Sequence, residues 1–145
     1  MNRMMLLALF SLLLLLAGCR LGIKRTPEAV RHALKTQFPD ASHVEWEKDF
    51  STYKAEFHHE GREKECWFSK DGDWVLTKTK LTIFDIPAPV LAAARDYSDW
   101  EIDNVALCKQ SNGVSTYYEV EYEHEQIPGE KRIRILPNGT TFMDF

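Results

Sequence analysis

The sequence lacks the short motifs that mark many enzyme active sites. Its 145 residues contain no Gly-x-Ser-x-Gly turn, no phosphate-binding loop, no dinucleotide-binding glycine pattern and no His-Glu-x-x-His zinc motif. Each of these patterns supplies a nucleophile, a phosphate cradle or a metal site, so the sequence gives no support to the enzyme classes that use them. We therefore expect a protein that is not an enzyme and that needs no cofactor.

An excess of positive charge is also lacking. The chain has 18 lysines and arginines against 22 aspartates and glutamates, which gives a formal net charge of −4 at pH 7. Proteins that bind nucleic acid neutralise its phosphates with clustered basic side chains. The composition therefore argues against nucleic acid as a partner.

No apolar run is long enough for a comfortable membrane span. The longest, residues Met4–Leu16, falls short of the ~20 residues that a transmembrane helix needs. Arg3 before this run and small residues after it are typical of a secretory signal. The four residues Leu16–Cys19 read Leu-Ala-Gly-Cys, which is similar to the lipobox of bacterial lipoproteins. In a lipobox the cysteine is acylated and the chain is cut just before it.

The lipobox predicts a lipoprotein signal peptide over residues 1–18, lipidation of Cys19 and an anchor linker over residues 19–25. Two acyl chains on one cysteine suffice for stable membrane anchoring. Arg20 stands where an aspartate often retains lipoproteins at the inner membrane. We therefore expect an outer-membrane lipoprotein of the cell envelope that faces the periplasm. The alternatives are an ordinary signal with a chance cysteine, or an uncleaved anchor.

Cysteine is scarce, with only Cys66 and Cys108 left once Cys19 carries lipid. A pair of thiols in an oxidising compartment can form a disulfide. Sequence spacing alone does not show whether these two are bridged, so both states remain open.

The chain repeats itself. Residues Pro27–Val30 recur as Pro87–Val90, and the alternating segment Tyr53–Phe57 recurs as Tyr118–Tyr122. The offset grows from 60 to 65 residues between these matches, as loop insertions would cause. The recurrence of segments in the same order at nearly the same spacing indicates a repeated structural unit. We expect one domain over residues 26–145, built from two repeats, 26–85 and 86–145.

Each repeat is predicted to begin with a helix and to continue with strands. Pro27 and Pro87 suit the first helical position, and apolar residues follow at helical spacing in both copies. In Tyr118–Glu125, aromatic and apolar residues alternate with glutamates, which is typical of a strand with one buried face. Glycine-containing pairs mark the hairpin turns. The predicted class is α+β, with a helix and four antiparallel strands (αββββ) occurring twice and the helices packed on one sheet face. The turns are expected at Gly61, Gly72, Gly113, Gly129 and Gly139.

Three motifs of the first repeat occur in a recognisable order: Phe38–Ala41 after the helix, Val44–Trp46 on a strand, and Phe68–Trp74, which reads Phe-x-x-Asp-Gly-x-Trp. This order resembles the PepSY-like family of bacterial envelope lipoproteins, also described as β-lactamase-inhibitor-like, over nearly all of residues 26–145. Related modules occur in propeptides of secreted metallopeptidases and in inhibitors of secreted hydrolases. The resemblance implies a binding or inhibitory module without enzymatic activity, and its motifs are structural rather than functional.

Aromatic residues are the candidates for binding a partner. If Cys66 and Phe68 face the core, Trp67 faces outward, and Tyr117 has the outward parity of its own strand. Trp74 can be assigned to either face. Trp and Tyr on an open sheet face are typical anchors of protein interfaces. The alternative is that they pack beneath neighbouring helices or loops.

Histidines and glutamates are weaker candidates. His58 and His59 are adjacent on a strand and so point to opposite faces, which disfavours their binding one metal ion together with His124. The glutamates at 119, 121, 123 and 125 could form a cation site or paired acids. Since Arg132 and Arg134 lie one hairpin away, we interpret these glutamates as cross-strand ion-pair partners.

Two functions follow as hypotheses. The first is a lipid-anchored, non-enzymatic periplasmic binding module that engages another envelope protein through its sheet, with a secreted or envelope hydrolase or peptidase as the target it inhibits or modulates. The second is an envelope sensor that binds a small ligand in the groove between the repeats, or a metal ion at the histidines.

Overall fold

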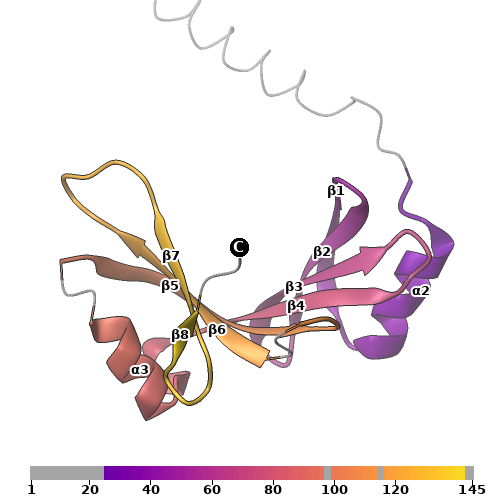
Figure 1. Ribbon diagram of the computed structural model, residues 1–145. Coiled ribbons are helices and arrows are strands. Elements are labelled where there is room, and N and C mark those ends of the chain that lie inside the picture. Colours follow the sequence, from indigo (N-terminus) through magenta and orange to yellow (C-terminus); the bar gives the residue numbers. More distant parts are fainter. Residues whose placement is uncertain (1–24, 97–98, 114–115, 143–145) are drawn as a thin grey trace, which may run out of the picture.

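The structure, a computed structural model, describes residues 25–96, 99–113 and 116–142. The predicted signal peptide and Cys19 lie outside these residues. Helices and strands follow one another in a simple order (Figure 1). The elements are α2 (Glu28–Gln37), β1 (Ser42–Asp49), β2 (Thr52–His59), β3 (Arg62–Ser69), β4 (Trp74–Leu81), the 3-10 helix η1 (Ile83–Asp85), α3 (Ala88–Arg95), β5 (Glu101–Gln110), β6 (Thr116–Glu123), β7 (Lys131–Ile135) and β8 (Thr141–Phe142).

The eight strands form a single antiparallel sheet in which every strand pairs with its neighbour in the chain. The predicted α+β class is confirmed, with two α-helices and an eight-stranded antiparallel sheet. Among the residues that the structure describes, no helix has the length and apolar character needed to cross a membrane.

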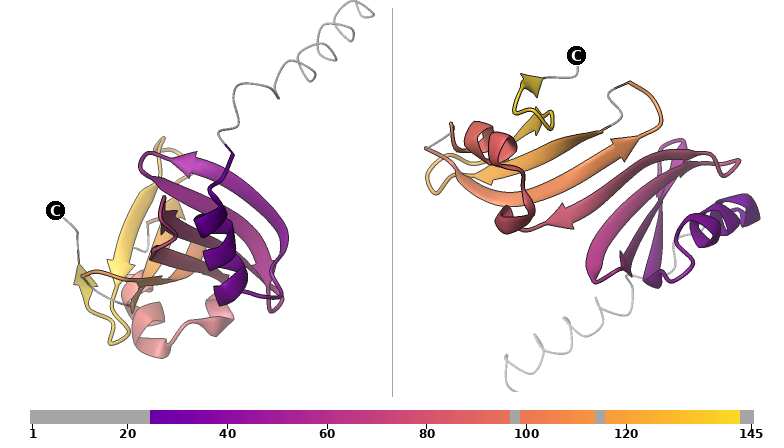
Figure 2. Two further views of the ribbon diagram at one scale, coloured as in Figure 1. Left: turned by 90° about the vertical axis from the view of Figure 1, so that its right-hand side faces the viewer. Right: turned by 90° about the horizontal axis from the view of Figure 1, so that it is seen from below.

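Both helices pack on the same face of the sheet. The strand register places six residues, one from each of β2–β7, in one row across the sheet: Phe57, Lys64, Thr79, Leu107, Tyr118 and Ile135. Phe57 belongs to the core beneath α2, and Ile135 belongs to the core beneath α3. One face therefore carries both helices, which lie on the outer side of a bent sheet (Figures 1 and 2).

Helix α2 forms because its apolar residues recur on one side. Val30 and Leu34 are buried against β2 and β3, together with Ala55 and Phe68. The helix begins at Glu28, one residue later than predicted, because Pro27 has the extended ψ of 148°. No side chain caps its first turn.

The two turns at Gly72 and Gly139 require glycine. Both residues have positive φ angles, 91° and 90°, which side chains disfavour. An added Cβ would lie 2.8 Å from the carbonyl oxygen of Ala29 at Gly72, and 2.7 Å from that of Pro89 at Gly139. Each glycine therefore lets a strand-connecting turn approach the backbone of the helix in its own half of the molecule.

Candidate functional site

The face of the sheet opposite the helices is the most distinctive surface of the protein, and we call it the open face. A row of residues from β1–β6 lies on it, pairing in the order Glu45, Glu56, Glu65, Lys78, Cys108 and Tyr117. The open face lies on the inner side of the bend in Figure 1, away from α2 and α3. It carries many charged side chains and one small apolar cluster, formed by Ala106, Cys108 and Tyr117 with Leu76 and Phe142 packed against them. The opposite face holds the two larger apolar cores.

Charge is divided across the open face. Strands β1–β3 carry the acidic flank, which we define as Glu45, Glu47, Glu56, Glu63 and Glu65. Lys54 lies among these glutamates, 2.7 Å from Glu56 and 2.9 Å from Glu47, and their hydrogen bonds, that of Glu56 first, raise its pKa above the usual range.

Strands β4 and β7 carry the basic flank, which consists of Lys78, Lys80, Arg132 and Arg134. The two flanks meet between β3 and β4, where Lys80 donates to Glu63 at 3.2 Å. The open face is therefore polarised along the sheet, from acidic at β1 to basic at β7.

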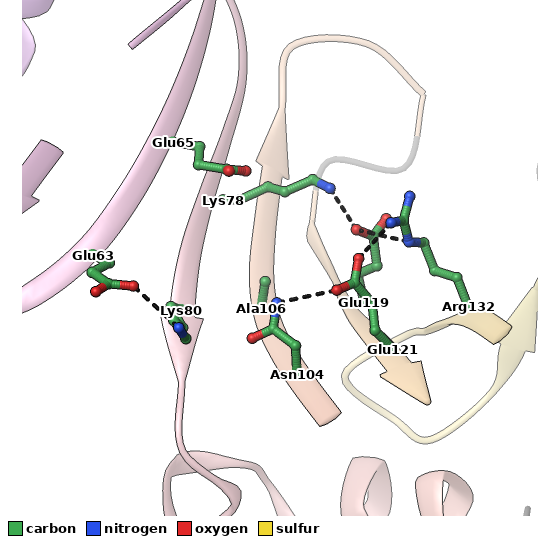
Figure 3. A pocket seen from close by; sticks show the side chains of 9 residues that line it. All are labelled: Glu63, Glu65, Lys78, Lys80, Asn104, Ala106, Glu119, Glu121 and Arg132. Atoms are coloured by element: carbon green, nitrogen blue, oxygen red, sulfur yellow. Dashed lines mark hydrogen bonds and ion pairs between the residues drawn. The ribbon is translucent and has the colours of Figure 1, made fainter. Parts of the chain in front are cut away.

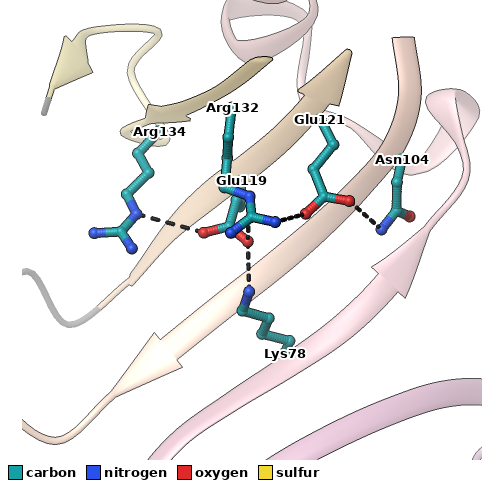
Figure 4. Close-up of polar contacts among 6 residues, drawn as sticks. All are labelled: Lys78, Asn104, Glu119, Glu121, Arg132 and Arg134. Atoms are coloured by element: carbon teal, nitrogen blue, oxygen red, sulfur yellow. Dashed lines mark hydrogen bonds and ion pairs between the residues drawn. The ribbon is translucent and has the colours of Figure 1, made fainter. Parts of the chain in front are cut away.

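Glu119 on β6 organises the basic flank (Figure 4). Its side chain is only 3% exposed, yet three cations surround it. Lys78 Nζ lies 2.5 Å from one carboxylate oxygen, Arg134 Nε lies 3.4 Å from the other, and Arg132 Nε lies 3.7 Å away. The Glu119 carboxylate therefore positions the long side chains of three basic residues on the open face. These contacts, with Arg132 also 2.5 Å from Glu121, confirm the predicted cross-strand pairing for Glu119 and Glu121. Glu123 lies opposite Glu101 instead, and Glu125 lies beyond the end of β6.

A depression of about 280 Å³ lies where the flanks meet (Figure 3). Glu63 and Lys80 line one side of it, and Glu119 and Arg132 line the other. Asn104 also lines it and donates to Glu121 at 3.3 Å, while its Oδ1 atom is buried without a hydrogen-bond partner among the described residues. A buried acceptor without a hydrogen bond is uncommon and destabilising. Asn104 Oδ1 could therefore accept a hydrogen bond from a bound partner or a water molecule.

Trp67 lies on the open face, in line with its predicted parity. Its ring is partly buried, and Nε1 donates to Asp49 Oδ2 at 3.0 Å. Lys78 Nζ lies 5.7 Å from the ring centroid. The ring is thus fixed between the two flanks, with part of its surface available for contact.

Tyr117 also lies on the open face, but the expectation that it is exposed is wrong. Only 2% of its surface is accessible, because β8 crosses over it. Phe142 contacts its ring edge-on at 5.6 Å, and the guanidinium of Arg134 lies 5.2 Å from the ring centroid. Burial raises the pKa of Tyr117 to about 12. Tyr117 therefore belongs to a small buried cluster on the open face, and a partner could not reach it without displacing Phe142.

Trp74 lies on the opposite face. A β-bulge between Trp67 and Phe68 shifts the register, so that Trp74 pairs with Phe68 and packs against the core under α2. Its Nε1 donates to Thr77 Oγ1 at 2.8 Å. Trp74 is therefore not brought together with Trp67.

The three candidate histidines lie apart. His58 is exposed on the open face beside His43, and His59 lies on the helix face, where its ring contacts Phe38 at 5.2 Å. His124 Nδ1 accepts backbone N–H groups in the turn after β6. Within the described ranges, no three His, Cys, Asp or Glu side chains are grouped so that they could hold a metal ion.

Cys66 and Cys108 are free thiols on opposite faces of the sheet. Cys66 faces the core under α2, where its Sγ lies 3.3 Å from Thr77 Oγ1. Cys108 lies beneath Tyr117 on the open face. Burial raises the pKa of Cys66 to about 11 and that of Cys108 to about 12. Neither thiol has the lowered pKa that marks a reactive cysteine.

These thiols predict a loss of stability at alkaline pH. Because the folded pKa values exceed the unfolded value of ~8.5, the folded state binds protons more tightly than the unfolded state. The contribution of the two protonated thiols to the free energy of unfolding is complete below about pH 8.5. It is lost as the pH rises toward their folded pKa values of about 11 and about 12. Urea unfolding between pH 7 and 10.5 measures it. Replacing both cysteines by alanine should make the free energy of unfolding less dependent on pH in this range. If the decrease with pH is the same in that variant, other groups cause it.

Phe50 is a candidate that the sequence patterns did not indicate. It lies in the two-residue turn between β1 and β2, directly after Asp49, and is 96% exposed. Its φ angle is +47°, a conformation that a bulky side chain rarely adopts. What could have indicated Phe50 in the sequence is that an aromatic residue stands at a tight turn, where glycine or asparagine is usual. The hairpin holds an apolar ring in solvent beside the acidic flank.

Comparison with known proteins agrees with this architecture. Residues 18–62 and 51–131 match a family described as beta-lactamase-inhibitor-like, PepSY-like. The chain belongs to this PepSY-like family. The resemblance predicted from the motifs around Phe38, Trp46 and Trp74 is thereby confirmed.

Solved structures from Bacteroides share the fold. A BLIP-like protein of Bacteroides fragilis is 30% identical, with a TM-score of 0.74 over 84% of this chain and 86% of its own. A DUF2874 family protein of Bacteroides uniformis is 27% identical, with a TM-score of 0.76 over 82% and 88%. A protein of Bacteroides eggerthii described as periplasmic is 25% identical, with a TM-score of 0.75 over 82% and 87%. No curated protein sequence matches this PepSY-like chain.

Proposed function

We propose that this chain is a lipid-anchored, non-enzymatic binding module of the periplasm that engages another envelope protein through its open face. The observation that carries this proposal is the asymmetry of the sheet. One face is covered by α2 and α3. The other face carries no helix among the described residues, is divided into acidic and basic flanks, and is covered only around Tyr117, where Phe142 packs. The exposed ring of Phe50 lies at the turn that joins β1 and β2.

The open face has the dimensions of a protein interface. Seven strands spaced ~4.8 Å apart and mostly eight residues long present roughly 750 Å². Each partner in a typical stable complex buries about 800 Å². A polarised surface steers a partner of opposite polarity and fixes its orientation. Trp67 and Phe50 would supply the aromatic anchors that contribute most to binding energy.

The target class comes from the family. The family description and the relative described as BLIP-like point to inhibition or modulation of a hydrolase, with a secreted or envelope peptidase as the related possibility. The chain's own surface supports a binding role for a second reason. Many charged groups of the open face are engaged in ion pairs with one another, as at Glu119, and so form a fixed pattern of charge that a partner can match.

Lipidation of Cys19 would place the module at the outer membrane, facing the periplasm. The Leu-Ala-Gly-Cys sequence supports the anchor, Arg20 supports the outer membrane, and the periplasmic relative supports the compartment. Residues 19–25 would then serve as the linker to the domain. A Cys19→Ser variant that still fractionates with membranes as fully as wild type would contradict the lipid anchor.

Two repeats, residues 26–85 and 86–145, would explain why one apolar core lies beneath α2 and a second lies beneath α3. Gly72 and Gly139 make the same close approach to the backbone of α2 and α3, at residues 67 positions apart. Because the contact is made by backbone atoms, the same geometry in both halves supports a common structure even where the side chains differ.

A second pair of contacts supports the same duplication. In each half an aromatic ring lies edge-on to a histidine with ring centroids 5.2 Å apart, and a lysine lies over that ring. The first set is Phe38, His59 and Lys64, and the second is Trp100, His124 and Lys131.

Substitutions of the aromatic anchors test the binding role. We expect Phe50→Ser and Trp67→Ala each to weaken partner binding about 30-fold, the effect of losing a contact worth ~2 kcal/mol. Phe84→Ser is the matched control, because Phe84 is 92% exposed on η1, outside the open face. Titration of each purified variant with the captured partner gives the affinities. If all three variants bind as wild type does, the open face is not the binding surface.

A small ligand is the second candidate. A groove of about 550 Å³ lies on the helix side of the sheet between the two cores, with Trp74, Leu107 and Tyr118 as apolar lining and Lys109 at its rim. This volume falls within the usual range of ligand pockets. Thermal unfolding measured across a panel of envelope metabolites and metal ions is the test, and unchanged midpoints throughout would eliminate this candidate.

A further inference from the structure

The sheet has one long free edge. Strand β1 pairs with β2 on one side and has no neighbouring strand on the other among residues 25–96, 99–113 and 116–142. The opposite edge is formed by β8, which is only two residues long. Six of the eight residues of β1 are exposed. An edge of this length presents a row of backbone N–H and C=O groups that another strand could pair with.

An apolar groove runs beside this edge. It has a volume of about 300 Å³ and lies between α2 and β1. Its lining is mostly apolar and also includes Arg31 and Lys35 of α2. Leu34, Phe38 and Trp46 form its inner part, while Val44, which is 37% exposed, stands at the edge itself. A groove open on the side of an unpaired strand can receive side chains from a strand added there.

The other side of the same edge is acidic. Glu45 and Glu47 point to the open face and belong to the acidic flank. Successive side chains of a β-strand alternate between the two faces. A strand added to β1 would therefore place every second side chain in the apolar groove and the intervening ones beside the carboxylates.

We propose that the outer edge of β1 binds an extended segment of a partner protein by strand addition, and that this segment alternates apolar residues with lysine or arginine. Backbone pairing supplies affinity in this mode of recognition, and the pockets for alternate side chains supply specificity. The β1 edge is a different surface from the anchors Trp67 and Phe50, so it would bind such a segment whether or not the open face binds a folded partner.

The irregular part of β1 leaves room for this pairing. A β-bulge between Ser42 and Glu45, with His43 at a φ of +54°, disturbs the first half of the strand. Trp46–Asp49 then pairs with β2 in regular register. The regular half and Val44 border the groove and the glutamates, so the partner segment is expected to pair there.

A second copy of this chain fits the edge poorly. Two β1 strands pairing antiparallel with their open faces on the same side would bring the Glu45 and Glu47 carboxylates of both copies together. Like charges across neighbouring strands are destabilising. A basic segment relieves this repulsion, and the edge therefore favours a different chain.

The test uses the mature protein and an eight-residue peptide that alternates valine and lysine, acetylated and amidated at its ends. Three peptide outcomes are expected. The Val-Lys peptide binds and slows hydrogen exchange of β1 amides about tenfold or more. The same peptide N-methylated at every second residue, and a Val-Glu peptide, bind at least about tenfold more weakly.

Protein variants locate the site. Val44→Lys should weaken binding of the Val-Lys peptide about tenfold, because it removes an apolar side chain from the groove and adds a third cation to Arg31 and Lys35. Ile127→Lys is the matched control, because Ile127 is a similarly exposed aliphatic residue in the loop between β6 and β7, and it should have no effect. Trp67→Ala should also leave peptide binding unchanged, because Trp67 lies on β3, away from the edge, and this separates the edge from the open face.

Four results would overturn strand addition by a basic segment. They are no binding at millimolar peptide, binding without protection of the β1 amides, equal binding of the Val-Glu peptide, or a dimer in sedimentation that Val44→Lys abolishes. The last result would assign the edge to a second copy of the chain.

Discussion

Replacement of Glu119 by glutamine is expected to lower the free energy of unfolding by about 2–3 kcal/mol. The carboxylate is 3% exposed and has Lys78, Arg132 and Arg134 around it. Removing one partner of a buried ion pair is strongly destabilising, because the remaining charges lose their counter-ion. The three cations are 20–49% exposed and recover part of their hydration, so we place the loss below the 3–5 kcal/mol typical of a fully buried pair.

Urea unfolding measures this difference directly. Glu47→Gln is the matched control, since Glu47 pairs with Lys54 at 2.9 Å but is 65% exposed. An exposed ion pair contributes about 0–1 kcal/mol, so this control should change stability little. Equal effects of the two substitutions would mean that Glu119 does not organise the basic flank.

The second large effect is expected at the paired turns. Gly72→Ala and Gly139→Ala should each destabilise the protein by about 3 kcal/mol, because the new Cβ meets a helix carbonyl oxygen and the φ angle is left-handed. Gly61→Ala separates these causes. Gly61 has a φ of +72° and no atom within 4 Å of an added Cβ. Gly61→Ala should therefore lower the free energy of unfolding by only about 1 kcal/mol.

Similar losses at Gly72 and Gly139 would support equivalent turns in two repeats. Thermal or urea unfolding of the three variants is sufficient for the comparison. A loss at either position no larger than that of Gly61→Ala would show that the turn moves away from its helix without strain.

Strand parity predicted much of the candidate site. Alternation placed Trp67 on the uncovered face and opposed the β6 glutamates to Arg132 and Arg134, because the side-chain period of a strand is two wherever pairing is regular. Glycines likewise marked five of the six turns that directly connect consecutive strands, since positive φ angles occur there. The exception is the turn between β1 and β2, where Phe50 takes the positive φ angle.

Alternation alone did not settle two positions: it left Trp74 open between the two faces, and it did not show that Tyr117 is buried. Trp74 follows a β-bulge, which changes the register between β3 and β4. Tyr117 has the predicted parity but is covered by Phe142, which belongs to a strand of two residues. Periodicity does not reveal so short a strand, and it says nothing about which segment folds over a side chain.

Phe50 and the β1 edge also depend on tertiary structure. An exposed aromatic residue in a turn is visible in the sequence, but its place beside the acidic flank follows from the hairpin and the pairing of β1 with β2. Likewise, the sequence does not show that β1 ends the sheet, because strand order is set by the long-range pairing of β4 with β5.

Site-specific photo-cross-linking in the native envelope tests the central claim most directly. A photoreactive residue would replace Glu65 on the open face in one strain and Lys109 on the helix side in another, both in the full-length chain. We predict one dominant envelope protein cross-linked through position 65, and none through position 109, with the product lost in Phe50→Ser. Equal cross-linking from both positions, or none from position 65 despite normal expression, would contradict binding through the open face.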